Sequence, residues 1–288
     1  MRRLPDLNGW LFVAPSLLLI AAFLVYPIVD AFWMSLHSGK GSVVQFVGFG
    51  NVLRLIDDPV FIEALQNTFI FLIVQVPLMI VLALIMATCL NMPGLKWRGL
   101  LRTAVFLPCV TSLVAYSLLF RSMFAYDGVI NVAFMSMGLI SEPISWLIDP
   151  FWARVVVILA ITWRWTGYNM IFFLAAMQNI DKSIYEAARI DGISPARAFL
   201  SLTVPMLKPV ILFSTVTSTI GTLQLFDEVF NITKGGPSYS TTTLSLYIYN
   251  LSFKFVPNFG YAATVSYVIV VLSAILAFFQ FYAVREKD

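Results

Sequence analysis

Six apolar stretches divide the chain, and each is about as long as a helix needs to be to cross a lipid bilayer. Shorter polar segments separate them, so the pattern predicts an all-α integral membrane protein with six transmembrane helices. Prolines such as Pro108 interrupt the first three stretches and free backbone carbonyls, so we expect kinked spans there. The predicted spans are residues 10–36, 67–90, 101–120, 152–177, 210–230 and 259–283.

The composition agrees with a membrane protein. Of the 288 residues, 60% are hydrophobic and 11% are charged, whereas a soluble domain carries about 25% charged residues. The net charge of +3 gives no sign of nucleic-acid binding. Cys89 and Cys109 lie in apolar stretches, so we interpret both as buried free thiols. With His37 as the single histidine, the sequence offers no metal site.

Lys and Arg residues are unevenly distributed between the two ends of the predicted spans. Eleven lie in residues 1–9, 91–102, 178–209 and 284–288, whereas five lie in the segments on the opposite side. Positively charged loops are retained in the cytoplasm, so we expect both termini and the 178–209 loop to be cytoplasmic. Residues 1–9 and 284–288 are then the cytoplasmic ends of a 10–283 transmembrane domain.

Two features lie in the segments on the other side of the predicted membrane, a long connector and an acidic doublet. Residues 121–151 include an apolar run that is too short to span, which predicts an interfacial or re-entrant helix. Asp57 and Asp58 form an acidic doublet, which we interpret as a solvated turn.

The longest polar segment, 178–209, carries clear signals for two short helices. Asp181 or Ser183 can cap the first helix. Gly192 can end it, because glycine readily adopts the left-handed conformation found at helix ends. A second helix is expected to begin at Pro195, directly after a serine cap. The segment therefore predicts a compact helical hairpin between the fourth and fifth spans.

This segment resembles the EAA loop of membrane subunits of binding-protein-dependent ABC importers. The family pattern is E-A-A, three residues, G, nine residues, a branched apolar residue, any residue and L-P. Here Leu202 occupies the branched apolar position, and Val204 replaces the leucine before the proline. The resemblance implies that the loop is seated in a groove of a partner ATPase. The residues that match the coupling segment are Glu186, Ala187, Ala188, Asp191, Gly192 and Pro205.

The resemblance extends over most of the chain. The segments FLAAMQNIDKSIYEAARIDG and FDEVFNITKGGPSYSTTTLSLYIYNLSF are similar to segments of sugar permeases of the maltose, lactose and glycerol-phosphate type. The family implies a type I importer permease in the bacterial inner membrane, with a cytoplasmic coupling loop between helices 4 and 5. It also implies a second homologous permease, two ATPase subunits and an extracytoplasmic solute-binding protein as partners. ATP and Mg would bind to the ATPase subunits, and this chain would be a transport subunit without enzymatic activity or a cofactor.

The fifth predicted span carries small and polar residues at a helical spacing. Ser214, Thr217, Gly221, Gln224 and Glu228 are three or four positions apart, which places them on one face. Lipid does not solvate a polar stripe, so this face should turn toward another helix or a water-filled cavity. Helix packing explains the first three residues, whereas Gln224 and Glu228 fit a substrate path equally well.

The fourth predicted span contains an arginine about midway along its length. Arg164 is costly there unless it is paired or hydrated, so we expect an ion pair with Glu228 or Asp227, or direct contact with substrate. Aromatic faces pack on sugar rings, and Arg and Asn side chains can bind sugar hydroxyls. The candidates for a substrate path are Arg164, Trp165, Tyr168, Asn169, Gln224 and Glu228.

Three other functions are compatible with parts of the pattern. The same type of importer could carry glycerol phosphate, a polyamine, phosphate or a metal chelate. A membrane enzyme acting on lipid-linked sugar would require paired acids or a His–acid cluster at the interface, and only the Asp57–Asp58 doublet lies near one. A stand-alone secondary transporter would be expected to show an internal repeat, and none is visible. The sequence therefore favours an importer permease for a sugar or oligosaccharide.

Overall fold

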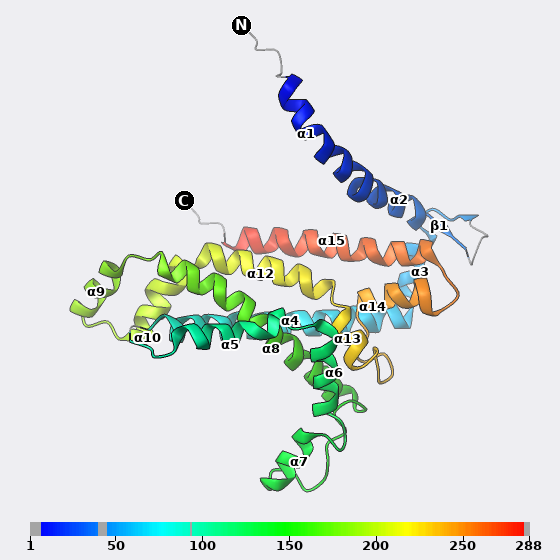
Figure 1. The fold of residues 1–288 in the computed structure, drawn as a ribbon. Helices are drawn as coiled ribbons and strands as arrows, with labels where there is room; N and C mark the ends of the chain where they lie inside the picture. Colours follow the sequence, from blue (N-terminus) through cyan, green and yellow to red (C-terminus); the bar gives the residue numbers. More distant parts are fainter. Residues whose placement is uncertain (1–6, 40–44, 93, 285–288) are drawn as a thin grey trace. The chain divides into compact units, whose positions relative to one another are not determined.

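The fold is helical throughout, apart from one short pair of antiparallel strands in the described part of the chain (Figure 1). The computed structural model describes residues 7–39, 45–92 and 94–284. The chain divides into two compact units, Met1–Asp58 with Tyr247–Val268, and Pro59–Leu246 with Ile269–Asp288. The prediction of an all-α membrane protein is confirmed, and six candidate spans are reached when each of two bent helix pairs counts as one span.

The first unit begins with one apolar helical segment that includes a π-helical turn. Its residues from Gly9 to Ser35 form a candidate membrane span. The elements of this unit are α1 (Leu7–Ile20), η1 (Ala21–Val25), α2 (Tyr26–Ser35), β1 (His37–Ser38), β2 (Gln45–Phe46), α3 (Gly50–Ile56) and η3 (Asn250–Lys254). Helices α14 (Leu244–Tyr249) and α15 (Phe259–Val284) continue from one unit into the other.

Asn51 stabilises the end of the first span in this unit through side-chain hydrogen bonds. Its side-chain amide donates to the carbonyl oxygens of Ser35 and His37, at 2.8 Å each. Thr264 donates to the Ser35 carbonyl as well, at 3.2 Å. The bonds to Ser35 satisfy a carbonyl that the helix leaves open at its last turn, and the bond to His37 fixes the start of β1.

Asp58 is not part of a solvated turn, which corrects the expectation from the sequence. Its Oδ2 atom accepts hydrogen bonds from the hydroxyls of Tyr247 at 2.5 Å and Tyr261 at 2.6 Å. The Arg54 guanidinium lies 4.2 Å from the centroid of the Tyr261 ring. The Asp58 carboxylate, which follows α3 and accepts these two hydroxyl hydrogen bonds, therefore connects the end of α3 to Tyr247 of α14 and to the first turn of α15.

The second unit contains the remaining helices. They are α4 (Pro59–Asn91), α5 (Arg98–Val110), α6 (Leu113–Met123), α7 (Val129–Ser136), α8 (Pro150–Gln178), α9 (Lys182–Ile190), α10 (Pro195–Ala198), η2 (Phe199–Thr203), α11 (Val204–Met206), α12 (Lys208–Leu223) and α13 (Asp227–Ile232). In Figure 1, α4, α5, α8 and α12 lie alongside one another within this unit.

The core of the second unit lies between α4 and α8. Apolar side chains of the two helices, including Met79, Ala83 and Phe173, are fully or almost fully buried against each other. Gly167 lets α5 approach α8 closely, because a Cβ atom there would collide with the Val105 carbonyl. Close approach through small residues is a common way for membrane helices to associate.

Two predicted spans differ from the observed helices. The third, predicted as continuous over 101–120, breaks between α5 and α6 with a bend of 95°. The fifth, predicted over 210–230, ends at Leu223, and a new helix starts at Asp227. The bend of the third span follows Pro108, which removes a helical hydrogen bond and is sterically incompatible with a straight helix. Gln224 and Glu228 therefore do not share one continuous helix.

Asn131 organises the connector between α6 and α8. Its amide nitrogen donates to the carbonyls of Tyr126 and Ile144, and its Oδ1 atom accepts from the Ile144 amide and the Trp146 indole. One side chain thus joins the short helix α7 to the chain that leads into α8. The connector contains a short helix, as expected from its apolar run, and it is fixed by a buried amide.

Candidate functional site

The predicted coupling segment forms the helical hairpin expected from its caps. Asp181 Oδ1 accepts the Ser183 amide at 2.9 Å, and this bond holds the pKa of the Asp181 carboxyl below its usual range. Gly192 has φ +69°, which is unfavourable for residues with a Cβ atom. The Ile193 amide then bonds the Ala188 carbonyl at 2.9 Å, so the carbonyls at the end of α9 are satisfied.

The second half of the hairpin is fixed to the first by one side-chain contact. Ser194 caps α10 by accepting the Arg197 amide at 3.4 Å. Beyond the π-helical turn, the Thr203 hydroxyl lies 2.9 Å from the Tyr185 hydroxyl of α9. Of the predicted coupling residues, Ala188 is buried within the hairpin. The others are exposed on its surface, namely Glu186, Ala187, Asp191, Gly192 and Pro205.

A second candidate site surrounds Arg164 of α8. The side chain is 92% buried, and its amino groups donate to the carbonyl oxygens of Thr111 at 3.1 Å and Cys109 at 3.4 Å. These two carbonyls lie at the break between α5 and α6, where helical hydrogen bonding is lost. A cation is favourable at the carboxyl end of a helix, so Arg164 stabilises the break in the third span.

Arg164 and Glu228 meet at the same tyrosine. The guanidinium lies 4.7 Å from the centroid of the Tyr116 ring, and the Glu228 carboxylate is close to the hydroxyl of that tyrosine. In the described part of the chain, however, Arg164 forms no ion pair with Glu228 or Asp227, which corrects one of the two sequence interpretations. Glu228 is 4% exposed, so the Arg164 and Glu228 side chains are both held inside the protein.

The aromatic residues of the predicted path form a ladder along one side of α8 and onto α12. Trp165 and Tyr168 pack edge to face with ring centroids 5.7 Å apart. Tyr168 in turn contacts Phe172 at 4.9 Å, and Phe172 contacts Phe213 of α12 at 5.8 Å. Trp165 and Phe172 are partly exposed, and Tyr168 and Phe213 are exposed, so the ladder presents ring surface outside this chain.

The remaining predicted residues divide between the interior and the surface. Asn169 is buried and donates to the Trp165 carbonyl at 3.1 Å and to the Met79 sulfur at 3.5 Å. Ser214 is also buried, and its hydroxyl has no hydrogen-bond partner among the described residues. By contrast, Thr217, Gly221 and Gln224 are exposed. Arg164, Trp165, Tyr168 and Asn169 all lie on α8, whereas Gln224 is exposed directly after α12 and Glu228 is buried in α13.

Sequence reasoning missed Tyr116 and the two carbonyls at the helix break. The available signal was Pro108 followed by the polar pair Thr111 and Ser112 inside an apolar stretch. Such a combination indicates that a span is interrupted and that a polar group must satisfy its open carbonyls.

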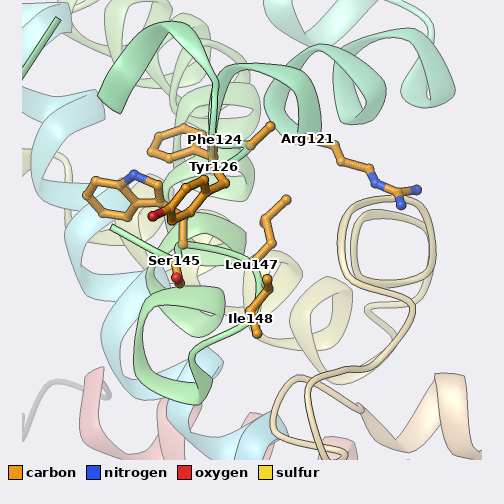
Figure 2. Close-up of a pocket in the computed structure, with 8 residues that line it drawn as sticks. Arg121, Phe124, Tyr126, Ser145, Leu147 and Ile148 are labelled. Atoms are coloured by element: carbon orange, nitrogen blue, oxygen red, sulfur yellow. The ribbon is translucent and has the colours of Figure 1, made fainter. Parts of the chain in front are cut away.

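A pocket of about 260 Å³ lies in the connector between α6 and α8. Figure 2 shows Phe124, Tyr126 and Leu147 gathered around it, whereas the Arg121 guanidinium extends away from them. The walls are almost entirely carbon, so the pocket offers few groups for the hydroxyls of a sugar. No group of three His, Cys, Asp or Glu side chains in the described segments is placed to hold a metal ion.

Comparison with known proteins gives whole-length relatives. The chain is 63% identical to the lactose transport system permease protein LacF of Rhizobium radiobacter, covering 100% of this chain and 97% of that protein. It is 33% identical to the sulfoquinovosyl glycerol transport system permease protein SmoG of Agrobacterium fabrum, covering 100% and 96%. Its fold is similar to that of a bacterial ABC transporter involved in the import of the acidic polysaccharide alginate, with a TM-score of 0.82, 24% identity and 96% of each chain covered.

The family comparison covers both candidate sites. Residues 10–287 match the family described as binding-protein-dependent transport system inner membrane component. That range includes the helical hairpin around Gly192 and the broken span beside Arg164. The chain therefore belongs to the family of inner-membrane components of binding-protein-dependent transport systems.

Proposed function

We propose that this chain is the permease subunit of an ATP-driven ABC importer for a disaccharide or short oligosaccharide, with a lactose-type sugar as the first candidate. The observation that supports a lactose-type sugar as the cargo is the 63% identity to a lactose permease protein along the whole chain. Relatives at about half that identity have names that refer to other saccharides, such as arabinooligosaccharides at 33%. As a member of this family, the chain is a transport component and not an enzyme.

The hairpin between α8 and α12 is the proposed contact with the ATPase. A rigid element can transmit the closure of an ATPase dimer only if its two helices keep their angle. The left-handed Gly192 and the contact between Tyr185 and Thr203 support such rigidity. Glu186 and Ala187 are exposed beside this corner and are available to a partner surface. The ATP and Mg needed for transport would be bound by two ATPase subunits.

The proposed substrate path runs along the exposed aromatic ladder and the open face of α12. Trp165 and Tyr168 offer ring faces to a pyranose, and Gln224 offers an amide to its hydroxyls. A second, homologous permease subunit would close the other side of this path. Arg164, Asn169 and Glu228 would act indirectly, by holding the helices that carry the path.

The proposed orientation of the chain in the membrane follows from the distribution of Lys and Arg and from the position of the hairpin. The excess of Lys and Arg lies on the side of both termini and of the 178–209 loop. We place that side in the cytoplasm, where ATP is available. The opposite ends of α4 and α8 then face the extracytoplasmic binding protein that delivers the sugar.

A phosphorylated or anionic cargo is the second candidate, because the sulfoquinovosyl glycerol permease is among the relatives. Such a cargo requires a cation that is free to bind it. Both amino groups of Arg164 already donate to backbone carbonyls, so this arginine gives little support to an anion site. A neutral sugar agrees better with the exposed rings and amide.

The decisive experiment is ATP-dependent uptake of labelled sugars by proteoliposomes that contain the complete complex and its binding protein. Lactose uptake, competed by related disaccharides, is the expected result. If glycerol phosphate is taken up and no sugar is, the second candidate replaces the first. If the complex transports neither class, the proposed function is wrong.

The coupling role is tested in the same assay with Gly192→Ala and Gly192→Asn. Alanine is strained at φ +69°, whereas asparagine tolerates the left-handed conformation better. We expect Gly192→Ala to reduce uptake per ATP hydrolysed and Gly192→Asn to retain more of it. Lys182→Ala is the control, because Lys182 is exposed on α9 but lies outside the predicted coupling residues. Equal coupling in all three variants would contradict the proposal.

A further inference from the structure

Residues 233–243, here called the threonine loop, form a connection with an unusual backbone. Three residues other than glycine have positive φ values in it, Lys234 at 55°, Ser238 at 46° and Tyr239 at 63°. Each such conformation costs free energy and persists only where surrounding contacts impose it. All three side chains are exposed. The loop therefore presents a tip whose shape is set by the structure behind it.

The back of the threonine loop is fixed by buried side chains. Thr241 and Thr242 donate to the carbonyls of Gly236 and Gly235, at 2.8 and 2.9 Å. Thr243 donates to the Leu225 carbonyl at 2.6 Å. All three threonines are at most 1% exposed. These three hydroxyl bonds hold the loop internally and to the segment after α12, and none of them reaches the long helices.

Arg154 of α8 joins the threonine loop to the long helices. Its Nε atom donates to the Ser240 carbonyl at 2.8 Å and to Asn67 Oδ1 of α4 at 3.1 Å. Its terminal amino group pairs with Glu63 at 3.0 Å. An arginine that joins two helices and a loop carbonyl fixes their relative positions through bonds in several directions.

Asn67 extends the connection to two more loop carbonyls. Its amide donates to Tyr239 at 2.8 Å and to Thr242 at 3.1 Å. Because Arg154 binds the oxygen of this amide, it also fixes which way the amide points. Removing Arg154 would release the Ser240 carbonyl directly and the Tyr239 carbonyl through Asn67.

The tip lies at the end of the second unit opposite the ATPase-coupling hairpin. Arg154 is in the second turn of α8, and the hairpin follows the last turn of the same helix. A helix of 29 residues is roughly 43 Å long at 1.5 Å per residue, which exceeds the thickness of the hydrocarbon core. In the proposed orientation the tip therefore faces the side from which the sugar-loaded binding protein arrives.

We propose that Arg154 is a positioning residue that sets the threonine loop, so that its tip at Lys234, Ser238 and Tyr239 can engage the sugar-loaded binding protein. This inference rests on the proposed function for the identity of the partner. The positioning itself rests on the bonds of Arg154 and Asn67. A preset tip avoids the cost of ordering a loop when the two proteins associate.

The test measures sugar uptake by the reconstituted complex as a function of the concentration of loaded binding protein. We expect Arg154→Ala to raise the KM for the binding protein about tenfold while leaving the maximal rate largely unchanged. Arg154→Lys keeps the charge but cannot bond in as many directions, so it should restore only part of the affinity. Arg121→Ala is the matched control, because Arg121 is exposed in the last turn of α6 and should leave KM unchanged.

Two further measurements keep the test decisive if Arg154→Ala folds poorly. Lys234→Ala and Tyr239→Ala alter exposed residues, so they should leave the melting temperature unchanged and raise the same KM. With Cys89 and Cys109 replaced by serine, a spin label on Ser238→Cys should become more mobile when Arg154 is replaced. If the tip variants leave KM unchanged, or if Arg154 variants lower only the maximal rate, the proposal is overturned.

Failure of the proposed function has a different signature. The wild-type complex would then transport no sugar at any concentration of binding protein. The spin label would still report whether Arg154 sets the loop, because that measurement requires no cargo. Unchanged mobility in Arg154→Ala would overturn the positioning role whatever the cargo is.

Discussion

The Arg164 guanidinium donates a 3.1 Å hydrogen bond to the carbonyl oxygen of Thr111, which joins the middle of α8 to the break between α5 and α6. The residues are 53 positions apart in the sequence. The bond explains how a sharp bend is tolerated inside an apolar span, because a buried cation replaces the missing helical amides.

Replacing Arg164 should destabilise the protein more than it alters any direct contact with sugar. Arg164→Ala removes bonds from a buried charged group to two partly buried carbonyls, so we expect a loss of about 2 kcal/mol in the free energy of unfolding. Arg164→Lys should retain part of the stability that Arg164→Ala loses. The measurement is thermal unfolding of the purified protein in detergent, with Arg121→Ala as the exposed control. An unchanged melting temperature combined with a weaker affinity for sugar would instead favour direct substrate contact.

Gly167 and Gly221 form a matched pair for testing helix approach. At Gly167 a Cβ atom would collide with the Val105 carbonyl, whereas at Gly221 it would meet nothing within 4 Å. We expect Gly167→Ala to cost about 1–3 kcal/mol, because α5 and α8 must move apart. Gly221→Ala should be neutral or stabilising by about 0.5–1 kcal/mol through helix propensity. Thermal unfolding of both variants checks this, and equal effects would contradict the tight contact.

Tyr247 should make stability sensitive to alkaline pH. Burial, with the hydrogen bond to Asp58 as a further cause, raises the pKa of Tyr247 above its ordinary value. A tyrosine whose pKa is raised in the folded state stabilises the folded protein. This stabilisation is fully present at pH values below the pKa of the unfolded tyrosine, about 10, and is lost as the pH rises further. We expect the melting temperature of the wild type to fall more steeply above that pH than the melting temperature of Tyr247→Phe.

The same variant separates the hydroxyl from the ring. Phenylalanine keeps the packing of Tyr247 but removes its donation to Asp58, so below pH 10 it should be somewhat less stable than the wild type. Tyr249→Phe is the comparison at a neighbouring tyrosine of the same helix, and it should keep the alkaline dependence of the wild type. Parallel pH profiles for wild type and Tyr247→Phe would show that the hydroxyl does not titrate with unfolding.

Several features could be predicted because they depend on neighbouring residues. The caps at Asp181 and Ser194 and the corner at Gly192 were expected from the sequence and are present. Each depends on hydrogen bonds or backbone angles within a few positions. The apolar stretches likewise indicate spanning helices, because their length and composition alone decide whether they can cross a bilayer.

The partners of the buried charges could not be predicted in the same way. From the sequence, Arg164 was expected to form an ion pair or to contact substrate, and the structure gives it backbone carbonyls at a helix break. Asp58 was expected in water, yet it accepts two tyrosine hydroxyls from residues about 190 and 200 positions away. Only the folded chain brings such groups within hydrogen-bond distance.

The sequence by itself determined that this protein is a helical membrane component with a capped helical hairpin after α8, because those properties follow from local composition and short-range bonds. The tertiary structure decided where the third span breaks, which carbonyls Arg164 satisfies and how Arg154 holds the threonine loop. These outcomes depend on contacts between distant segments, whose geometry is set only when α4, α5, α8 and the loop pack together.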